Sequence, residues 1–293
     1  MNRLQNILAG FFFAGAAVFA GSARADELVV RDRFSDEIVG QGPDLVFIPG
    51  LASSRDTWNA TAERLKDHYR LHLIQVAGFA GEPARANGQG PVLAPTAEAI
   101  DAYLVEQHLT PATVIGHSLG GTMILYLAEH HPADLKKAMV VDSLPFYALL
   151  MFGPAATTVQ VQPVADAIRS GKSKMTDAQH AQLMSGMATA QTDRDMIDGW
   201  SKASDASAVA NALADDMLLD LRPGLPSVTT PITLVYPDYV SLGRPQDASD
   251  KMYRALYASV KPMTFVPATN SLHFVMLDQP AQFNAALDAF LAQ

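Results

Sequence analysis

Short apolar runs and longer amphipathic stretches alternate along most of the chain. Residues 45–48 are continuously apolar, as expected of a strand that is buried on both faces of a parallel sheet. Residues 96–108 instead carry apolar side chains at helical spacing. This alternation predicts right-handed crossovers and a mostly parallel α/β sheet with helices on both faces. Eight stretches are predicted to form its strands: residues 27–34, 37–40, 45–48, 69–76, 113–117, 137–142, 231–236 and 262–267.

The alternation stops at residue 144 and resumes near residue 229. Between these points the pattern is that of amphipathic helices, rich in methionine and almost without strand-like runs. We therefore expect a core formed by residues 26–143 and 229–293, with a helical cap at residues 144–228 inserted after the sixth strand. Four cap helices are predicted, at residues 161–169, 177–189, 194–203 and 206–221.

The first 25 residues have the pattern of a secretory signal peptide. Arg3 supplies the positive charge, residues 7–20 are apolar, and Ala23-Arg24-Ala25 is a cleavage pattern. The apolar run is short for a membrane-spanning helix, and no second long run follows. We expect cleavage after Ala25, a periplasmic or secreted protein, and no stable membrane insertion of the mature chain.

Charge and cysteine content narrow the classes of partner. The formal net charge of −9 becomes −11 without the signal peptide, which contains Arg3 and Arg24 and no acidic residue. An acidic chain without basic clusters argues against nucleic acid and favours a small-molecule substrate. The chain has no cysteine, so it forms no disulfide. The oligomeric state is not indicated.

Residues 113–121 carry the strongest chemical signal. Gly116 and Gly120 flank Ser118 in a G-x-S-x-G pattern, between an apolar β-branched run and a helical pattern. Such a turn presents the serine in a strained conformation, with glycines where side chains would collide. The sequence therefore predicts a strand, a sharp turn with an exposed nucleophilic serine, and a helix.

A serine nucleophile needs a base to remove its proton. His273, in a loop after the last predicted strand, is the expected base, because the other seven histidines have structural interpretations. His117, for example, is expected to point away from the tip of the turn. The spacing of the histidines contains no H-E-x-x-H or similar ligand pattern, so we expect no catalytic metal and no cofactor.

Three motifs resemble those of the α/β-hydrolase superfamily, and the resemblance covers essentially all of the mature chain. They are the 48–51 loop Ile-Pro-Gly-Leu leading to Trp58, the Ser118 turn, and the segment Leu-His-Phe-Val-Met-Leu-Asp-Gln-Pro at 272–280. The resemblance implies an α/β-hydrolase sheet and an oxyanion hole made by the backbone N–H groups of Leu51 and Leu119. Many relatives carry His-Gly where this chain has Pro-Gly before Leu51.

The resemblance leaves two aspartates as candidates for the acid of the triad. Asp142 ends the predicted strand 137–142, and Asp238 follows the strand 231–236. Many members place the acid after the later strand in a G-x-x-D setting, where this chain has Val240. Haloalkane and fluoroacetate dehalogenases resemble this chain in carrying the acid at the position of Asp142. We favour Asp142 and keep Asp238 as the alternative.

These residues predict an exported serine hydrolase that cleaves an ester, lactone or thioester of an apolar substrate. Trp58 and Phe146 are expected to line the substrate pocket, with Phe79, Tyr147 and cap methionines. An amidase or aminopeptidase, an acyltransferase or a perhydrolase would use the same triad, and sequence alone does not separate them. A non-catalytic binding protein would need a broken triad position.

Overall fold

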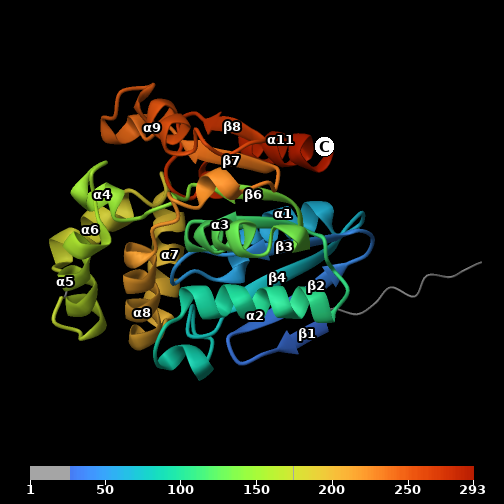
Figure 1. Ribbon diagram of the computed structural model, residues 1–293, viewed down its shortest axis with the longest axis horizontal. Coiled ribbons are helices and arrows are strands. Elements are labelled where there is room, and N and C mark those ends of the chain that lie inside the picture. Colours follow the sequence, from blue (N-terminus) through green and yellow to red (C-terminus); the bar gives the residue numbers. More distant parts are fainter. Residues whose placement is uncertain (1–26, 174) are drawn as a thin grey trace, which may run out of the picture.

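An eight-stranded, mostly parallel sheet forms the centre of the molecule (Figure 1). The computed structural model describes residues 27–173 and 175–293, so the predicted signal peptide lies outside the described residues. The strand order is β1-β2-β4-β3-β5-β6-β7-β8. β2 pairs antiparallel with β1 and with β4, and the pairs from β4 to β8 are parallel. The sheet is thus the one that the sequence predicts.

Six of the observed strands agree with the predicted ranges within two residues, whereas β1 ends at Val30 and β2 begins at Phe34, inside the first predicted strand. The strands are β1 (Glu27–Val30), β2 (Phe34–Gly40), β3 (Asp44–Ile48), β4 (Arg70–Val76), β5 (Ala112–His117), β6 (Leu135–Val141), β7 (Ile232–Pro237) and β8 (Met263–Ala268).

Helices cover both faces of this sheet (Figure 1). Successive side chains of a strand point to opposite faces, so Val46 and Ile48 join one apolar cluster while Leu45 and Phe47 join the other. The first cluster contains residues of α2, α3 and α9, and the second contains residues of α1, α10 and α11. Their bounds are α1 (Asn59–Leu65), α2 (Leu93–Glu106), α3 (Leu119–His130), α9 (Ala248–Leu256), α10 (Val275–Asp278) and α11 (Pro280–Leu291).

The segment between β6 and β7 is helical, and it lies beside the sheet on the left of Figure 1. The second predicted helix ends early, at Ser185, because the carbonyls of Gly186 and Met187 accept hydrogen bonds from the backbone of His273 and Phe274. The inserted helices are α4 (Leu149–Phe152), α5 (Thr158–Arg169), α6 (Asp177–Ser185), α7 (Gln191–Ala203) and α8 (Ala206–Leu218).

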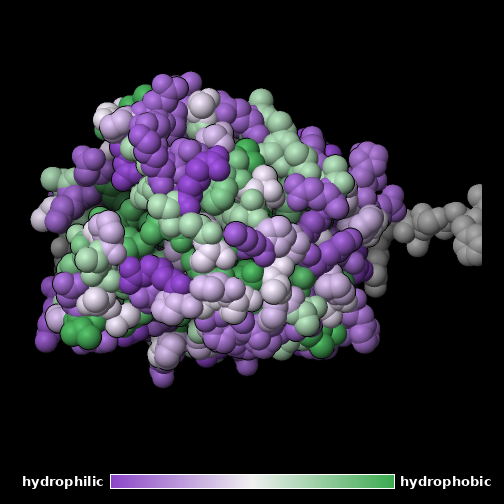
Figure 2. Space-filling model, turned by 45° about the horizontal axis from the view of Figure 1, so that its top comes forward, coloured by the Kyte–Doolittle hydropathy of each residue, from purple (hydrophilic) through white to green (hydrophobic). Residues whose placement is uncertain are grey.

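Short 3₁₀ turns complete the connections: η1 (Arg55–Trp58), η2 (Arg85–Gly88), η3 (Pro132–Asp134), η4 (Leu225–Ser227) and η5 (Val240–Leu242). Within residues 27–173 and 175–293, no helix has both the length and the apolar character needed to cross a membrane. The surface in Figure 2 is mainly hydrophilic, with apolar residues gathered in a hollow on the left of the view.

Candidate active site

Ser118 occupies a sharp turn between β5 and α3. Its backbone has φ 52° and ψ −120°, a conformation that non-glycine residues rarely adopt. A Cβ on Gly116 would lie 2.5 Å from the Gly120 carbonyl oxygen, and a Cβ on Gly120 would lie 2.4 Å from the Ile48 oxygen. Both positions therefore require glycine. The turn is held by the Ser118 N–H, which donates to the Val141 carbonyl over 2.9 Å.

His273 and Asp142 form a hydrogen-bonded pair beside this turn. The Nδ1–H of His273 donates to Asp142 Oδ2 over 2.5 Å, and both residues line the same cavity as Ser118. His273 lies in the loop after β8, whereas Asp142 directly follows β6 with a positive φ of 45°. The three side chains thus meet at the carboxyl ends of neighbouring parallel strands, where α/β sheets bind ligands.

Two tyrosines complete the surroundings of the Asp142 carboxyl group. Tyr239 donates to Oδ2 over 2.6 Å, and Tyr253 donates to Oδ1. Burial alone would raise the pKa of Asp142, but the His273 imidazole and these hydrogen bonds outweigh it and hold the pKa below its ordinary value. Asp142 is therefore ionised at neutral pH, as a partner for imidazolium must be. No sequence pattern linked either tyrosine to Asp142.

Asp238, the alternative acid, has a different contact set. Its carboxyl oxygens accept from the backbone N–H groups of Val240 and Asn270, at 3.2 and 2.9 Å. These bonds connect the loops that follow β7 and β8. The geometry thus brings Asp142, and not Asp238, to the imidazole of His273.

His117, at the end of β5, is buried beneath the site. Its Nε2–H donates to the backbone carbonyl of His273 over 3.1 Å, and the two rings lie 4.5 Å apart. Burial and the nearby His273 lower the pKa of His117 to about 3, so its imidazole is neutral. His117 therefore does more than point away from the turn, because it supports the main chain that carries His273.

The backbone N–H groups of Leu51 and Leu119 are both free to donate. Leu119 is the first residue of α3, and neither N–H has a hydrogen-bond acceptor among the residues that the structure describes. The loop of Leu51 is close to the turn, since a Cβ on Gly50 would lie 3.1 Å from Ser118 Cβ. The two donors are thus held next to the serine without any competing partner.

Gln75, which sequence reasoning missed, fixes the loop that contains Leu51. Its amide donates to the carbonyls of Ser53 and Phe79, at 3.1 and 3.2 Å, and its oxygen accepts from the Arg55 N–H over 2.8 Å. The available signal was a glutamine between two apolar residues near the end of β4. Such a buried amide is retained where it satisfies backbone groups of a loop.

Two of the predicted pocket residues lie elsewhere. Trp58 is fully buried, with its ring 5.3 Å from that of Phe47, and belongs to the core beneath α1 and α11. Phe146 is also fully buried and packs among the inserted helices, with the Arg222 guanidinium 4.6 Å from its ring centre. The prediction that they line the pocket is wrong, because aromatic residues near a site show the same pattern when they fill the core. Phe79 is likewise a core residue.

The cavity at the site has a volume of about 310 Å³. One wall is built from the ends of β5 and β6 and from the region of α9, and the other from the inserted segment. Tyr147 was predicted to line it, and the structure places it there. The lining residues are Ser118, Thr122, Asp142, Ser143, Leu144, Tyr147, Leu150, Asp216, Tyr239, Leu242, Arg244, Met252, Tyr253 and His273.

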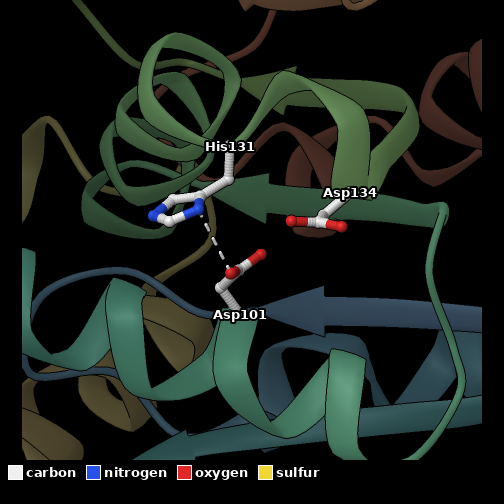
Figure 3. A group of neighbouring side chains, drawn as sticks. All are labelled: Asp101, His131 and Asp134. Atoms are coloured by element: carbon white, nitrogen blue, oxygen red, sulfur yellow. Dashed lines mark ion pairs between the residues drawn. The ribbon is translucent and has the colours of Figure 1, made fainter.

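A separate group of ionisable side chains lies outside this cavity. Asp101, His131 and Asp134 converge between α2 and the end of α3 (Figure 3), close enough together to hold a metal ion. His131 already uses both ring nitrogens, with Nε2 2.9 Å from Glu98 and Nδ1 3.4 Å from Asp101. We interpret the group as an ion-pair cluster that connects α2 to α3.

Known proteins share this fold and parts of this sequence. A model of the alpha/beta hydrolase family matches residues 45–286. The pimeloyl-[acyl-carrier protein] methyl ester esterase of Vibrio vulnificus is 35% identical over 109 residues, which cover 37% of this chain and 40% of that protein. The match therefore spans well under half the length of that relative.

Two solved structures illustrate the similarity of the fold. A hydrolase from Pseudomonas aeruginosa superimposes with a TM-score of 0.73 at 18% identity, covering 94% of this chain and all of that one. An esterase from Exiguobacterium antarcticum gives a TM-score of 0.72 at 18% identity, covering 89% and 96% of the two chains.

Proposed function

The chain belongs to the alpha/beta hydrolase family, and on this premise we propose that it is a serine hydrolase that cleaves carboxylic esters of apolar compounds. One observation carries the proposal. A hydrogen-bonded His273–Asp142 pair and a serine in a strained strand-to-helix turn line one cavity. Esterases among the similar proteins support the same reaction class.

In the proposed mechanism Ser118 Oγ attacks the ester carbonyl carbon while His273 Nε2 accepts the serine proton. Asp142, already bonded to Nδ1–H, stabilises the imidazolium that forms. The carbonyl oxygen becomes negative and receives hydrogen bonds from the N–H groups of Leu51 and Leu119. Each such donor contributes on the order of 10²- to 10³-fold in rate.

The tetrahedral intermediate then collapses, and the C–O bond to the alcohol breaks. His273 returns its proton to the alcohol oxygen, which leaves an acyl group on Ser118. Water attacks the acyl-enzyme with His273 again as the base, releasing the carboxylic acid and restoring the serine. No further reactant is needed, so the reaction balances as ester plus water to acid plus alcohol.

The cavity supports an apolar acyl or alcohol group. Leu144, Leu150, Leu242 and Met252 line it, and burying an alkyl chain against them is favourable by about 0.8 kcal/mol per methylene. Lactones and thioesters present the same reacting carbonyl and belong to the same proposal.

An assay with p-nitrophenyl butanoate and a fluorophosphonate serine probe tests this function. We expect the wild type to hydrolyse the ester and take up the probe, and we expect Ser118→Ala to lose at least about 10³-fold in kcat and all labelling. Absence of both activities in the folded wild type would refute the proposal. Preference for a matched anilide over the ester would identify an amidase instead.

We also propose that the protein is exported, on the basis of the sequence pattern of residues 1–25. Expression of the full chain in a bacterial host, followed by cell fractionation and N-terminal sequencing, tests this point. The expected product is periplasmic or secreted and begins at Asp26. A full-length cytoplasmic product would contradict it.

A further inference from the structure

Asp216 is a second carboxyl group in the active-site cavity, and the proposed mechanism does not use it. It lies on α8 and lines the cavity together with Ser118, yet only 6% of the residue is exposed. Its Oδ1 atom is buried and has no hydrogen-bond partner in the described part of the chain. Buried carboxyl oxygens are normally satisfied, so this one calls for an explanation.

The neighbouring Asp215 shows what a structural aspartate on α8 does. Its carboxyl accepts from the N–H groups of Val92 and Leu93, at 2.6 and 3.1 Å, and pairs with Arg169 over 2.5 Å. It therefore anchors α8 to the start of α2. Asp216, one position further along the helix, forms no ion pair with the residues that the structure describes and makes no comparable anchor.

The pKa of Asp216 agrees with a buried carboxyl group that lacks a charged partner. Burial raises the pKa of Asp216 to about 7, the Thr122 hydroxyl partly opposes this by favouring the charged form, and Asp215 adds to the rise. A cation in contact with the carboxyl would reverse the effect of burial. Among the residues that the structure describes, no cation contacts this carboxyl group.

The distance from the nucleophile can be estimated from α3. Thr122, which contacts Asp216, follows Ser118 by four residues on the same face of the helix. One helical turn rises about 5.4 Å. Ser118 and Asp216 line the same cavity, so a small ester held at Ser118 can also present a group a few bonds from its carbonyl carbon to Asp216.

The other charged residues of the cavity are already accommodated. Asp142 is bonded to His273, Tyr239 and Tyr253. Arg244 is exposed, with its guanidinium 5.4 Å from the centre of the Tyr239 ring. Asp216 is thus the charged lining group that a bound substrate would have to satisfy.

Resting on the ester-hydrolase function proposed above, we propose that Asp216 determines specificity by binding a protonated amine of the substrate. The amine lies a few bonds from the scissile carbonyl, as in esters of short amino acids. A charge-assisted hydrogen bond to the carboxylate would satisfy the unpartnered oxygen. An alkyl group in the same place would leave the carboxylate desolvated and unpaired, which a site discriminates against strongly.

Three methyl esters of nearly the same shape test the proposal in a pH-stat assay at pH 8. They are the esters of β-alanine, butanoic acid and 3-hydroxypropanoic acid, which end in an ammonium, a methyl and a hydroxyl group. We expect the wild type to show a kcat/KM at least about tenfold higher for the amine ester than for the other two. In Asp216→Asn the ratio between amine and alkyl esters falls to about one, mainly through KM of the amine ester.

Two variants serve as controls. Asp216→Glu keeps a carboxylate on α8 and should retain a preference for the amine ester. Asp195→Asn removes the same charge from an exposed position of the insertion and should keep the wild-type ratio. A wild type without amine preference, an unchanged ratio in Asp216→Asn, or equal use of the hydroxyl and amine esters would overturn the proposal.

A binding measurement separates this inference from the proposed function. n-Propylammonium should raise the Tm of the wild type more than 1-propanol does, and it should lose this advantage in Asp216→Asn. If p-nitrophenyl butanoate is hydrolysed but the ammonium has no advantage, the amine site alone is refuted. If the ammonium binds through Asp216 but no ester is hydrolysed, the esterase function alone is refuted.

Discussion

Two walls of one cavity each carry a buried carboxyl group, and the pKa values of the two groups are shifted in opposite directions. Asp142 comes from the end of β6 and Asp216 from the inserted helix α8, and each is 6% exposed. Asp142 has hydrogen bonds from three side chains and a lowered pKa, whereas Asp216 has a buried oxygen without a partner and a pKa raised to about 7. Equal burial thus accompanies opposite shifts of the pKa, because the hydrogen-bond partners of the two carboxyl groups differ.

The difference also separates the roles of the two regions. The wall built from the sheet presents groups that are satisfied within the protein and held in one geometry, as a catalytic centre requires. The wall built from the insertion presents a group whose partner must come from outside. Substitutions in either wall test whether the two carboxyl groups have these separate roles.

The largest expected effect is on turnover, through Asp142→Asn. The amide keeps the shape of the carboxyl but cannot stabilise imidazolium, so we expect kcat for p-nitrophenyl butanoate to fall by about 10⁴-fold. Asp238→Asn is the matched control, with an expected loss below about tenfold, since its oxygens bind only backbone N–H groups. Equal losses in the two variants would return Asp238 to consideration as the acid.

Next in size is an effect on stability, through Asp216→Asn. The folded pKa of Asp216, about 7, exceeds the unfolded value, so between about pH 4 and pH 7 the folded protein keeps a proton that the unfolded chain has lost. The free energy of unfolding of the wild type therefore decreases across this window, by up to about 1.4 kcal/mol per pH unit from this group. Asp216→Asn removes the titrating group and with it this decrease in the free energy of unfolding.

Urea unfolding at several pH values measures the difference. The variant should match the wild type near pH 4 and exceed it by about 2–4 kcal/mol at pH 8. Asp195→Asn, on the exposed surface, should show no such dependence. A stability difference between Asp216→Asn and the wild type that stays constant with pH would mean that Asp216 is not perturbed by burial.

The smallest effect is expected for Tyr253→Phe, which removes the donor to Asp142 Oδ1. The change raises the pKa of Asp142 toward that of Asp216. We expect it to lower kcat about tenfold. Tyr257→Phe is the control, because its hydroxyl donates to the Ser143 carbonyl over 2.8 Å instead. Both variants lose about 1–2 kcal/mol of stability, but kcat of Tyr257→Phe should fall by less than about threefold. Equal kcat losses would show that the tyrosine acts only through stability.

The sheet could be predicted from the sequence because doubly buried strands require nearly continuous apolar runs. The turn at Ser118 could also be predicted, since its backbone admits only glycine at Gly116 and Gly120. The residue that serves as the acid of the triad could not be predicted in this way. Asp142 and Asp238 both follow strands, and only the three-dimensional course of the loop after β8 decides which one His273 reaches.

The walls of the cavity were harder to predict for a related reason. Trp58 and Phe146 sit near functional segments in the sequence, but an aromatic side chain gives the same pattern whether it fills the core or a pocket. Asp216 follows Asp215 on a helix, and the sequence does not distinguish the side chain that anchors the helix from the one that lines the cavity. Which of the two lines the cavity depends on how α8 packs against α2 and α3.

The hydrogen bond between His273 and Asp142 joins residues 131 positions apart, with the whole insertion between them. Contacts of such long sequence separation form late in folding, because the loop must close before the contact stabilises it. A nascent or partly refolded chain therefore carries the Ser118 hydroxyl without its partner base. In the proposed mechanism, turnover begins only when the C-terminal strand docks, so recovery of activity reports completion of the entire fold.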